Sequence, residues 1–372
     1  MIVWLIDPDE SDPSIRWQVM RDLTRASDES VAAERARVAT EGWGARLLAL
    51  QDEDGQCGRD ALPAEGRPET GLPSPATRRQ LRELHGVSLA DLAGFLGVEA
   101  DTLAAWESGE PDATDERAAR YGSVVAWMWN LGTLKPEWTA TTYSLLLLRD
   151  MGLDPRSEQA RRAVALVRDN VKWDHDGQDF FDGEVEPCIN GKAVALGAYF
   201  GEDVDGIVTR LLAEQLEDGG WNCEAENGSV RSSFHTTIDV LDGLLEYEQA
   251  GGAIDVTEAR LRAQEYLLER RMFRRLSTGE VVDEAFTRFS YPPRWHYDVL
   301  RGLDYLRRAG ADPDPRLEEA VALVRSKRGP DGRWLLENTH PGRVHFPLDE
   351  GDGRPSRWNT LRALRVLDWY GD

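Results

Sequence analysis

The feature that most constrains the fold of this chain is an internal repeat of acidic-glycine turns. The turns occur in "LQDEDGQCG", "WDHDGQDFF", "QLEDGGWNC" and "RGPDGRWLL", whose central glycines are Gly55, Gly177, Gly219 and Gly332. A weaker copy, "RLSTGEVV", contains Gly279. Self-similarity that recurs every few tens of residues is the signature of a repeat architecture. Each turn therefore marks one structural unit.

Amphipathic segments flank every turn. "ARRAVALVRDNV" precedes one turn and "HTTIDVLDGLLEY" follows another, and in both the apolar residues recur at intervals of three and four. This spacing is typical of helices, and no segment alternates strongly enough to predict a sheet. The sequence therefore predicts an all-α barrel of five to six helical hairpins, each of roughly 40 to 60 residues. The glycine is expected to end the first helix of each hairpin in a left-handed conformation.

One gap in the repeat is too long. The four later glycines are separated by 42, 60 and 53 residues, whereas Gly55 and Gly177 are 122 residues apart. The excess begins with "ALPAEGRPETGLPSPA", whose proline and glycine content is typical of a linker. We therefore predict that the helical repeat occupies residues 1–57 and 127–372, and that 58–126 is a linker with an inserted domain.

The turn signature resembles a known family. Gln215, Gly219 and Trp221 form a Gln-x-x-x-Gly-x-Trp pattern, and Gln51 with Gly55 repeats its first two members. This pattern resembles the squalene cyclase and protein prenyltransferase β-subunit toroids of the terpenoid cyclase superfamily. The resemblance implies an α/α toroid, in which inner helices line a central cavity and outer helices surround them. The Gln, Gly and Trp residues themselves are expected to lock the turns.

The insert resembles a second family. Residues 77–110, "TRRQLRELHGVSLADLAGFLGVEADTLAAWESGE", resemble a Cro/repressor-type helix-turn-helix. In such domains the second helix enters the DNA major groove, which implies DNA contacts from Arg78, Arg79, Arg82 and Thr102. The side chains expected on the exposed face of the second helix are Glu99, Asp101, Thr102, Glu107 and Glu110. Because this face would place carboxylates in the groove, a protein-contact or vestigial module is favoured over a DNA-binding one.

Polar residues gather where the inner helices are expected to begin. These ends line one mouth of the cavity, and a ring of polar side chains there predicts a shared binding site. The candidate cavity residues are Asn190, Arg294, His296, Asp298, Arg357 and Asn359. None of them has a catalytic role that the sequence alone identifies.

Two of these helix starts suggest a metal site. "EVEPCINGKAVALGA" and, one repeat later, "FHTTIDVLDGLLEY" resemble the zinc-binding segments of protein prenyltransferase β subunits. The resemblance implies that Glu186, Cys188 and His235 bind zinc (Zn²⁺), with Cys223 as a further possible ligand. Three protein ligands would leave a fourth position for water or substrate. The alternative is that the cysteine is a small buried apolar residue and that the histidine caps a helix.

The family reactions themselves are not expected. Four acidic residues, Asp179, Asp182, Glu184 and Glu186, stand where prenyltransferases place basic residues for a diphosphate, and no inner helix starts with the cyclase Asp-x-Asp-Asp motif. We therefore expect a zinc-binding toroid that acts on, or binds, an apolar or thiol-containing small molecule in its central cavity. The alternative is a ligand-sensing transcriptional regulator that uses the inserted domain for DNA or protein binding.

Composition limits the setting and the partners. The 372 residues carry a formal net charge of −23, which repels nucleic acid and anionic membranes over the chain as a whole. No apolar run approaches the roughly 20 residues of a membrane span. Three cysteines are too few for a disulfide framework, which favours a reducing, cytoplasmic location.

Overall fold

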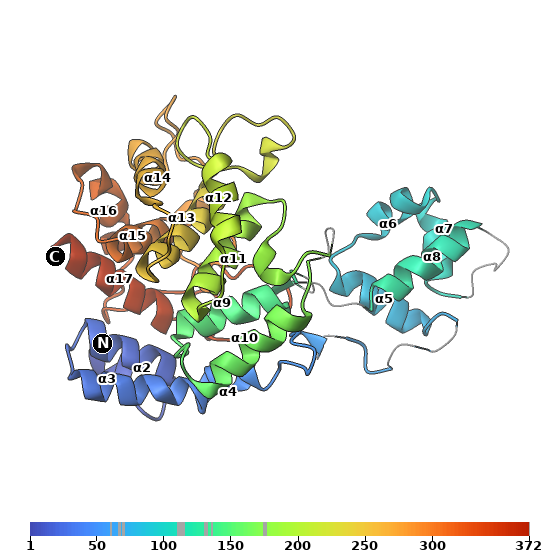
Figure 1. The fold of residues 1–372 in the computed structure, drawn as a ribbon, viewed down its shortest axis with the longest axis horizontal. Coiled ribbons are helices and arrows are strands. Elements are labelled where there is room, and N and C mark those ends of the chain that lie inside the picture. Colours follow the sequence, from blue (N-terminus) through green and yellow to red (C-terminus); the bar gives the residue numbers. More distant parts are fainter. Residues whose placement is uncertain are drawn as a thin grey trace. The chain divides into compact units, whose positions relative to one another are not determined.

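The structure is a computed structural model that divides into two compact units (Figure 1). The described residues are 1–59, 62–65, 68, 71–109, 116–129, 133–134, 137–173 and 177–371. The large unit comprises Met1–Ala49, Leu145–Pro341 and Phe346–Asp372, and the small unit comprises Leu50–Ser144 and Gly342–His345. Each unit is described separately below.

The described residues form helices and no extended strand, which confirms the predicted all-α class. The deeply buried helices are α2 (Pro13–Asp22), α9 (Thr141–Met151), α11 (Pro187–Phe200), α13 (Phe234–Gln249), α15 (Val299–Arg308) and α17 (Arg357–Tyr370). The less buried helices are α3 (Asp28–Ala36), α4 (Gly42–Leu48), α10 (Glu158–Asn170), α12 (Asp205–Ala213), α14 (Thr257–Glu269) and α16 (Glu318–Ser326). The short elements of the large unit are α1 (Ile2–Ile6), η1 (Arg37–Ala39), η4 (Phe180–Asp182), η5 (Cys223–Ala225), η6 (Glu284–Thr287) and η7 (Pro315–Leu317). None of the described helices is long and apolar enough to cross a bilayer.

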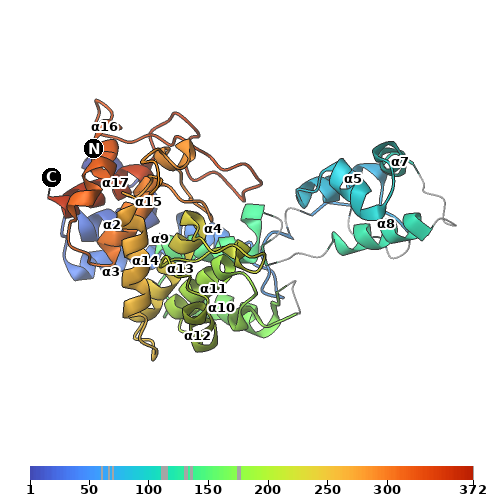
Figure 2. The same ribbon diagram turned by 90° about the horizontal axis from the view of Figure 1, so that it is seen from above.

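Burial separates inner helices from outer ones in the large unit. α11 and α13 are buried on nearly all sides, whereas α10 and α16 bury a single stripe, as expected for helices with one face in solvent. From α9 to α17 inner and outer helices alternate along the chain, as the toroid prediction requires (Figures 1 and 2). Arg365 of α17 donates to Gln18 of α2 (2.9 Å), and Trp17 of α2 donates to the Met151 carbonyl of α9 (2.8 Å). The last inner helix, α17, therefore contacts the first, α2.

All five repeat glycines adopt the predicted left-handed backbone, with φ between +66° and +97°. Their position differs from the prediction, because they lie in turns beyond the helix ends and do not cap the helices. α12, for example, ends at Ala213, and Gly219 closes a separate turn by donating its N–H to the Leu216 carbonyl (3.0 Å). A Cβ on Gly219 would lie 2.6 Å from the Arg262 carbonyl oxygen, so this turn excludes larger residues. The acidic partner of the Gly177 turn, Asp176, lies outside the described residues.

The Gln and Trp residues of the signature lock the turns in which they occur. Gln215 Nε2 donates to the Gly219 carbonyl (2.7 Å), and the corresponding glutamine of the first copy makes the same bond. Trp221 is fully buried, and its indole N–H donates to the Leu211 carbonyl of α12 (2.7 Å). Its backbone N–H donates to Thr237 Oγ1 in the first turn of α13 (3.1 Å). The turn thus ties an outer helix to the next inner helix.

The small unit has a core of its own. Its helices are η3 (Glu137–Thr139), α5 (Pro75–Leu84), α6 (Leu89–Leu96), α7 (Ala100–Trp106) and α8 (Glu116–Trp127). Leu92 and Leu96 of α6 pack with Leu103 and Trp106 of α7, and Gly97 joins the two helices with φ of +68°. These features agree with the predicted apolar faces, while the Cro/repressor-type identity stays a prediction.

The small unit extends beyond the predicted insert of 58–126. The flanking segments pair with each other, since the Cys57 backbone N–H donates to Thr141 Oγ1 (3.0 Å). In addition, a Cβ on Gly58 would lie 2.9 Å from the Thr139 carbonyl oxygen. The segments on either side of the insert therefore form part of the same compact body.

Candidate functional site

A carboxylate and two thiols converge at the start of α11. The ligand atoms of Glu186, Cys188 and Cys223 all lie within 4.8 Å of one another. Glu186 is the residue before α11, and Pro187 begins the helix in the position where proline's missing N–H costs nothing. Cys223 begins η5, and its Sγ lies 3.4 Å from Thr236 Oγ1 in the first turn of α13. Two neighbouring repeats therefore supply the three groups.

Close backbone packing fixes the two helix starts relative to each other. α11 and α13 approach at glycines: a Cβ on Gly191 would lie 2.6 Å from the Asp239 carbonyl oxygen, and one on Gly243 would lie too close to the Gly191 carbonyl. Gly191 is one turn from Cys188. Such glycine contacts hold the first turns of both helices in one arrangement.

The three groups fit a tetrahedral zinc ion. Zn–S and Zn–O bonds of about 2.3 and 2.0 Å at a tetrahedral angle place sulfur and oxygen about 3.5 Å apart. The Cys188 Sγ donates to Glu186 Oε2 at 3.4 Å, close to this separation. Thiolates suit zinc among the divalent metals. The donor set is therefore chemically and geometrically compatible with the metal.

The two thiols influence each other's ionisation. Their mutual hydrogen bond lowers the pKa of Cys223 and raises the pKa of Cys188, and burial further raises the latter. Cys223 therefore ionises first, and its thiolate stabilises the protonated thiol of Cys188. Two adjacent thiolates repel unless a cation lies between them. A metal ion is the kind of cation that would allow both to ionise.

His235 lies beside this group and not within it. Its Nδ1 accepts a hydrogen bond from the Tyr297 backbone N–H (2.8 Å), so the neutral ring carries its proton on Nε2. The ring packs edge-on against Phe286, Trp295 and His296. Burial lowers its pKa. In this tautomer His235 offers no lone pair on Nε2 for a metal.

The structure thus brings together two of the three residues predicted to bind metal. Glu186 and Cys188 are joined by Cys223, which the sequence indicated only as a further possible ligand. His235 remains close, because the next residue, Thr236, contacts Cys223. Whether the metal binds stays a prediction.

Three stacked rings form a wall next to His235. His296 lies between Trp295 and His340, with centroid separations of 3.7 Å on each side and interplanar angles of 25° and 9°. We call Trp295, His296 and His340 the ring stack. Burial lowers the pKa of His296 to about 3 and that of His340 to about 4, so both are neutral at pH 7. Trp295 is 38% exposed.

Three of the six candidate cavity residues hold the chain in place. The Asn190 amide both donates to and accepts from the backbone of Glu184 (2.7 Å each), and Asp298 caps α15 by accepting from the Arg301 N–H (2.8 Å). Asn359 Nδ2 donates to two loop carbonyls at 3.2 and 3.1 Å. All three are buried. Their contacts explain the polar ring as a set of helix-start anchors.

Of the other three candidates, Arg357 lies in a separate contact, whereas Arg294 and His296 are associated with the ring stack. The Arg357 guanidinium lies over the Trp4 ring (4.4 Å) and pairs with Glu10 (3.2 Å). Arg294 has φ of +58°, a strained conformation for a non-glycine residue that is common at functional sites. The charge of Arg294 contributes, after burial, to the low pKa of His340. Of the six candidates, His296 therefore belongs to the ring stack, and Arg294 acts on it through its charge.

Ion pairs occupy the space between the inner helices below the ring stack. Lys192 of α11 pairs with Asp239 of α13, and Arg301 of α15 pairs with Asp239 (2.7 Å) and Asp242 (2.9 Å). Arg308 pairs with Asp242 at 2.9 Å. We call these five residues the inter-helix ion pairs. Breaking such a buried pair is costly, because it leaves an uncompensated charge. Aromatic side chains also lie beside His235 and His296.

The predicted DNA contacts are only partly available in the small unit. Arg78 is 1% exposed and donates to the Trp106 and Gly109 carbonyls (2.7 and 2.9 Å). Arg82 forms a buried pair with Glu107 at 2.6 Å. Both guanidinium groups therefore hold α5 against the end of α7 and are not free to bind phosphates.

The rest of the predicted contact surface is exposed and acidic. Arg79 and Thr102 lie on the surface, as do Glu99 and Asp101 beside Thr102. Glu110 lies outside the described residues. The exposed face of α7 is thus acidic, as the sequence predicted, except that Glu107 is buried.

The comparisons with known proteins add little. No protein-family model matches the chain, and no curated protein matches it. The ligand-free type II terpene cyclase MstE from Scytonema is 17% identical, with 61% of this chain and 71% of that chain covered and a TM-score of 0.32. A variant of that enzyme in complex with its substrate, geranylgeranyl dihydroxybenzoate, is also 17% identical, with 61% and 70% covered and a TM-score of 0.29. With TM-scores this low, the likeness carries no argument about this chain, whose all-α architecture rests on its own helices.

Proposed function

We propose that the large unit is a zinc-dependent enzyme or binding protein for a thiol-containing small molecule with an apolar part. The observation that carries the proposal is the convergence of Glu186, Cys188 and Cys223 within 4.8 Å at the start of α11. Three protein ligands match zinc sites that keep an open position for substrate, whereas closed structural sites have four. A bound zinc ion lowers the pKa of a coordinated thiol or water and makes it nucleophilic near neutral pH.

The ring stack supports an apolar or aromatic substituent on the ligand. Trp295, His296 and His340 present stacked neutral rings, and Phe286 lies edge-on to His235 beside them. Flat rings bury large areas at low entropic cost. With pKa values of about 3 and 4, His296 and His340 are too weakly basic for general-base catalysis at pH 7. Their role in the proposal is to bind and orient.

The local charges argue against a prenyl diphosphate as substrate. Asp179, Asp182 and Glu184 precede the proposed ligands, and a diphosphate would be repelled by them. The inter-helix ion pairs also place buried charges between α11, α13 and α15, which are poor neighbours for a long isoprenoid chain. A short ligand at the mouth of the barrel agrees with both observations.

Metal analysis of the intact protein tests the proposal. We expect one zinc per chain in protein purified with zinc available, and loss of zinc in Cys188→Ser and Cys223→Ser. Cys57→Ser is the matched control, since Cys57 is the third cysteine and lies in the small unit. In Co²⁺-substituted wild-type protein, the sulfur-to-cobalt charge-transfer absorption should correspond to two thiolates, because the proposed site contains Cys188 and Cys223. Protein without stoichiometric metal would rule the proposal out.

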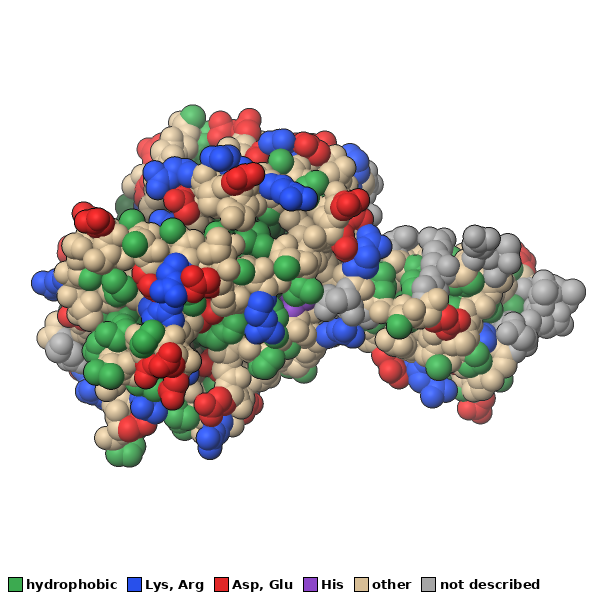
Figure 3. Space-filling model, turned by 90° about the horizontal axis from the view of Figure 1, so that it is seen from below, with side chains coloured by type: hydrophobic (Ala, Val, Ile, Leu, Met, Phe, Trp, Pro, Cys, Tyr) green, Lys and Arg blue, Asp and Glu red, His purple; other side chains and the backbone are tan. Residues whose placement is uncertain are grey.

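A second candidate function is a regulator that contacts a partner through the small unit. The observation in its favour is the separate core of α5 to α8, with an exposed Phe95 (65%) on α6 beside the acidic face of α7. Because Arg78 and Arg82 are engaged internally, this surface suits a basic protein segment better than DNA. The face of the large unit in Figure 3 differs from this surface, because acidic and basic side chains are interspersed on it.

Binding of genomic DNA fragments to the intact protein distinguishes these partners. We expect no salt-dependent complex by fluorescence anisotropy, and no difference between the wild type and Arg79→Glu. A tight complex that Arg79→Glu abolishes would show instead that the small unit binds DNA.

A further inference from the structure

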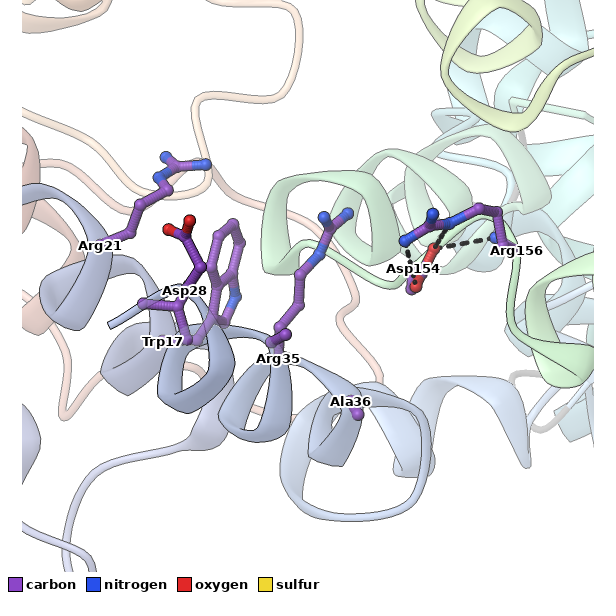
Figure 4. Close-up of a pocket in the computed structure, with 9 residues that line it drawn as sticks. Trp17, Arg21, Asp28, Arg35, Ala36, Asp154 and Arg156 are labelled. Carbon is purple, nitrogen blue, oxygen red and sulfur yellow. Dashed lines mark hydrogen bonds and ion pairs between the residues drawn. The ribbon is translucent and has the colours of Figure 1, made fainter. Parts of the chain in front are cut away.

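The large unit contains a cavity that the proposed zinc site does not involve. It has a volume of about 210 Å³ and lies between α2, α3 and the loop after α9 (Figure 4). Its lining residues are Trp17, Arg21, Asp28, Val31, Ala32, Arg35, Ala36, Asp154 and Arg156. We propose that this cavity binds a small organic monocarboxylate.

A rigid aromatic ring forms one wall of the cavity. The Trp17 indole N–H donates to the Met151 carbonyl (2.8 Å), and the ring is 5% exposed. Gly152, with φ of +82°, packs against the ring so closely that a Cβ would lie 2.1 Å from it. Arg21 and Arg35 lie over the ring at 4.7 and 5.1 Å, on either side of it in the view of Figure 4. The indole is therefore held in one orientation between two cations.

Two of the three arginines around the cavity bind carboxylates. Arg21 forms two bonds with Asp22 (2.6 and 3.0 Å), a carboxylate that Arg365 also contacts. Arg156 bonds both oxygens of Asp154 (3.2 and 3.3 Å). The donors of both guanidinium groups are therefore partly occupied.

Arg35 differs from both, because its bonds go to neutral oxygens. Its Nε donates to the Gly152 carbonyl (2.8 Å) and its Nη2 to Tyr199 Oη (3.0 Å). No carboxylate of the described chain forms an ion pair with it, although Asp154, whose pKa is lowered chiefly by its bonds to Arg156, also interacts with the charge of Arg35. A guanidinium has five N–H donors, so three remain beyond these two bonds. A half-buried cation, oriented by neutral acceptors, is a preorganised binding group for an anion.

The chemistry of the cavity selects a carboxylate with an apolar part. The planar guanidinium fork matches the two oxygens of a carboxylate. Val31, Ala32 and Ala36 add apolar side chains to the lining. Drug-sized ligands occupy cavities of about 300–1,000 Å³, so this one suits a smaller molecule. Asp28 on the rim adds negative charge, which disfavours a phosphate dianion relative to a monoanion.

Titration calorimetry of the intact protein with benzoate tests the inference. We expect saturable one-to-one binding that Arg35→Gln weakens about ten- to hundredfold, the range for a lost charge-assisted hydrogen bond. Arg156→Gln is the matched control, because it removes the same charge from the same cavity and should change the affinity less than about threefold, as expected for a paired surface charge.

Further variants and ligands keep the result interpretable if Arg35→Gln disturbs the fold. Ala32→Phe fills the cavity at an exposed helix position without altering Arg35, and it should abolish benzoate binding. Benzamide, which has the same shape without the charge, should not bind. The inference fails if benzamide binds as tightly as benzoate, if inorganic phosphate binds more tightly, or if Ala32→Phe leaves benzoate binding unchanged.

Discussion

Asp304 on α15 makes a contribution to stability that can be worked out from the structure. Burial raises the pKa of this carboxyl, but four guanidinium groups together outweigh burial and lower the pKa from 3.8 to about 2; they belong to Arg307, Arg365, Arg362 and Arg308. Arg307 Nε donates to Asp304 Oδ1 at 2.9 Å, and the Asp304 side chain is 16% exposed. At 1.36 kcal/mol per unit, this shift corresponds to about 2 kcal/mol of folding free energy.

Replacement of Asp304 by Asn removes the charge and keeps the shape. Because the pKa in the folded protein lies below the unfolded value, the stabilisation is complete above about pH 4 and is lost as the pH falls towards about 2. Asp304→Asn should therefore cost about 2 kcal/mol at pH 7 and pH 5, and about half of that at pH 3. Urea denaturation of both proteins at the three pH values measures this difference.

The matched control is Glu41→Gln. Glu41 pairs with Arg37 on the surface, where both side chains are 47% exposed, so the change should have little effect at any pH. The reasoning would be refuted if Asp304→Asn were as stable as the wild type at pH 7. It would equally be refuted if the difference were undiminished at pH 3.

Three further predictions concern the turn, the ring stack and the small unit. Trp221→Phe removes one indole N–H and leaves a buried carbonyl of α12 without its donor, so it should lower the free energy of unfolding by about 1–3 kcal/mol in urea denaturation. His296 and His340 should stay neutral down to pH 5 in imidazole NMR spectra of the folded protein. Because unfolding frees both rings to protonate below about pH 6.5, they lower the stability of the fold as the pH falls. Titration of either ring near pH 6.5 in the folded protein would contradict this prediction. Glu107→Gln leaves the buried Arg82 without its carboxylate and should destabilise the small unit by about 3–5 kcal/mol, as measured by hydrogen exchange in α5 and α7.

The repeat could be predicted from the sequence because its determinants are local. A glycine with positive φ leaves a recognisable pattern at each turn, and a buried tryptophan joins it in two of them, Trp221 and Trp334. The exact position of the glycine was wrong, because the helix ends before the turn begins. Helix ends depend on capping and packing that a sequence pattern defines only to within a few residues.

The composition of the candidate metal site depended on contacts that the sequence does not display. Cys223 reaches Cys188 because the loop after Trp221 folds back against Thr236 as η5. His235 turns towards Tyr297, whose backbone N–H occupies its Nδ1. Residue spacing alone could not show that Cys223 joins the site and His235 does not, since both residues lie in the same repeat.

Charge burial was the other feature that sequence reasoning missed. Asp239 and Asp242 on α13 and Arg301 and Arg308 on α15 recur at helical spacing, but only the packed inner helices show that these charges pair with one another. Similarly, Arg82 reads as a surface cation until its contact with Glu107 is seen.

Zinc K-edge X-ray absorption of the intact protein tests the central claim most directly. The structure predicts two sulfur neighbours at about 2.3 Å and lighter oxygen neighbours at about 2.0 Å, from Cys188, Cys223, Glu186 and an open-position ligand. His235→Gln should leave this spectrum unchanged. A single sulfur neighbour with imidazole scattering that disappears in His235→Gln would contradict the proposed ligand set, and protein without bound zinc would contradict the zinc site itself.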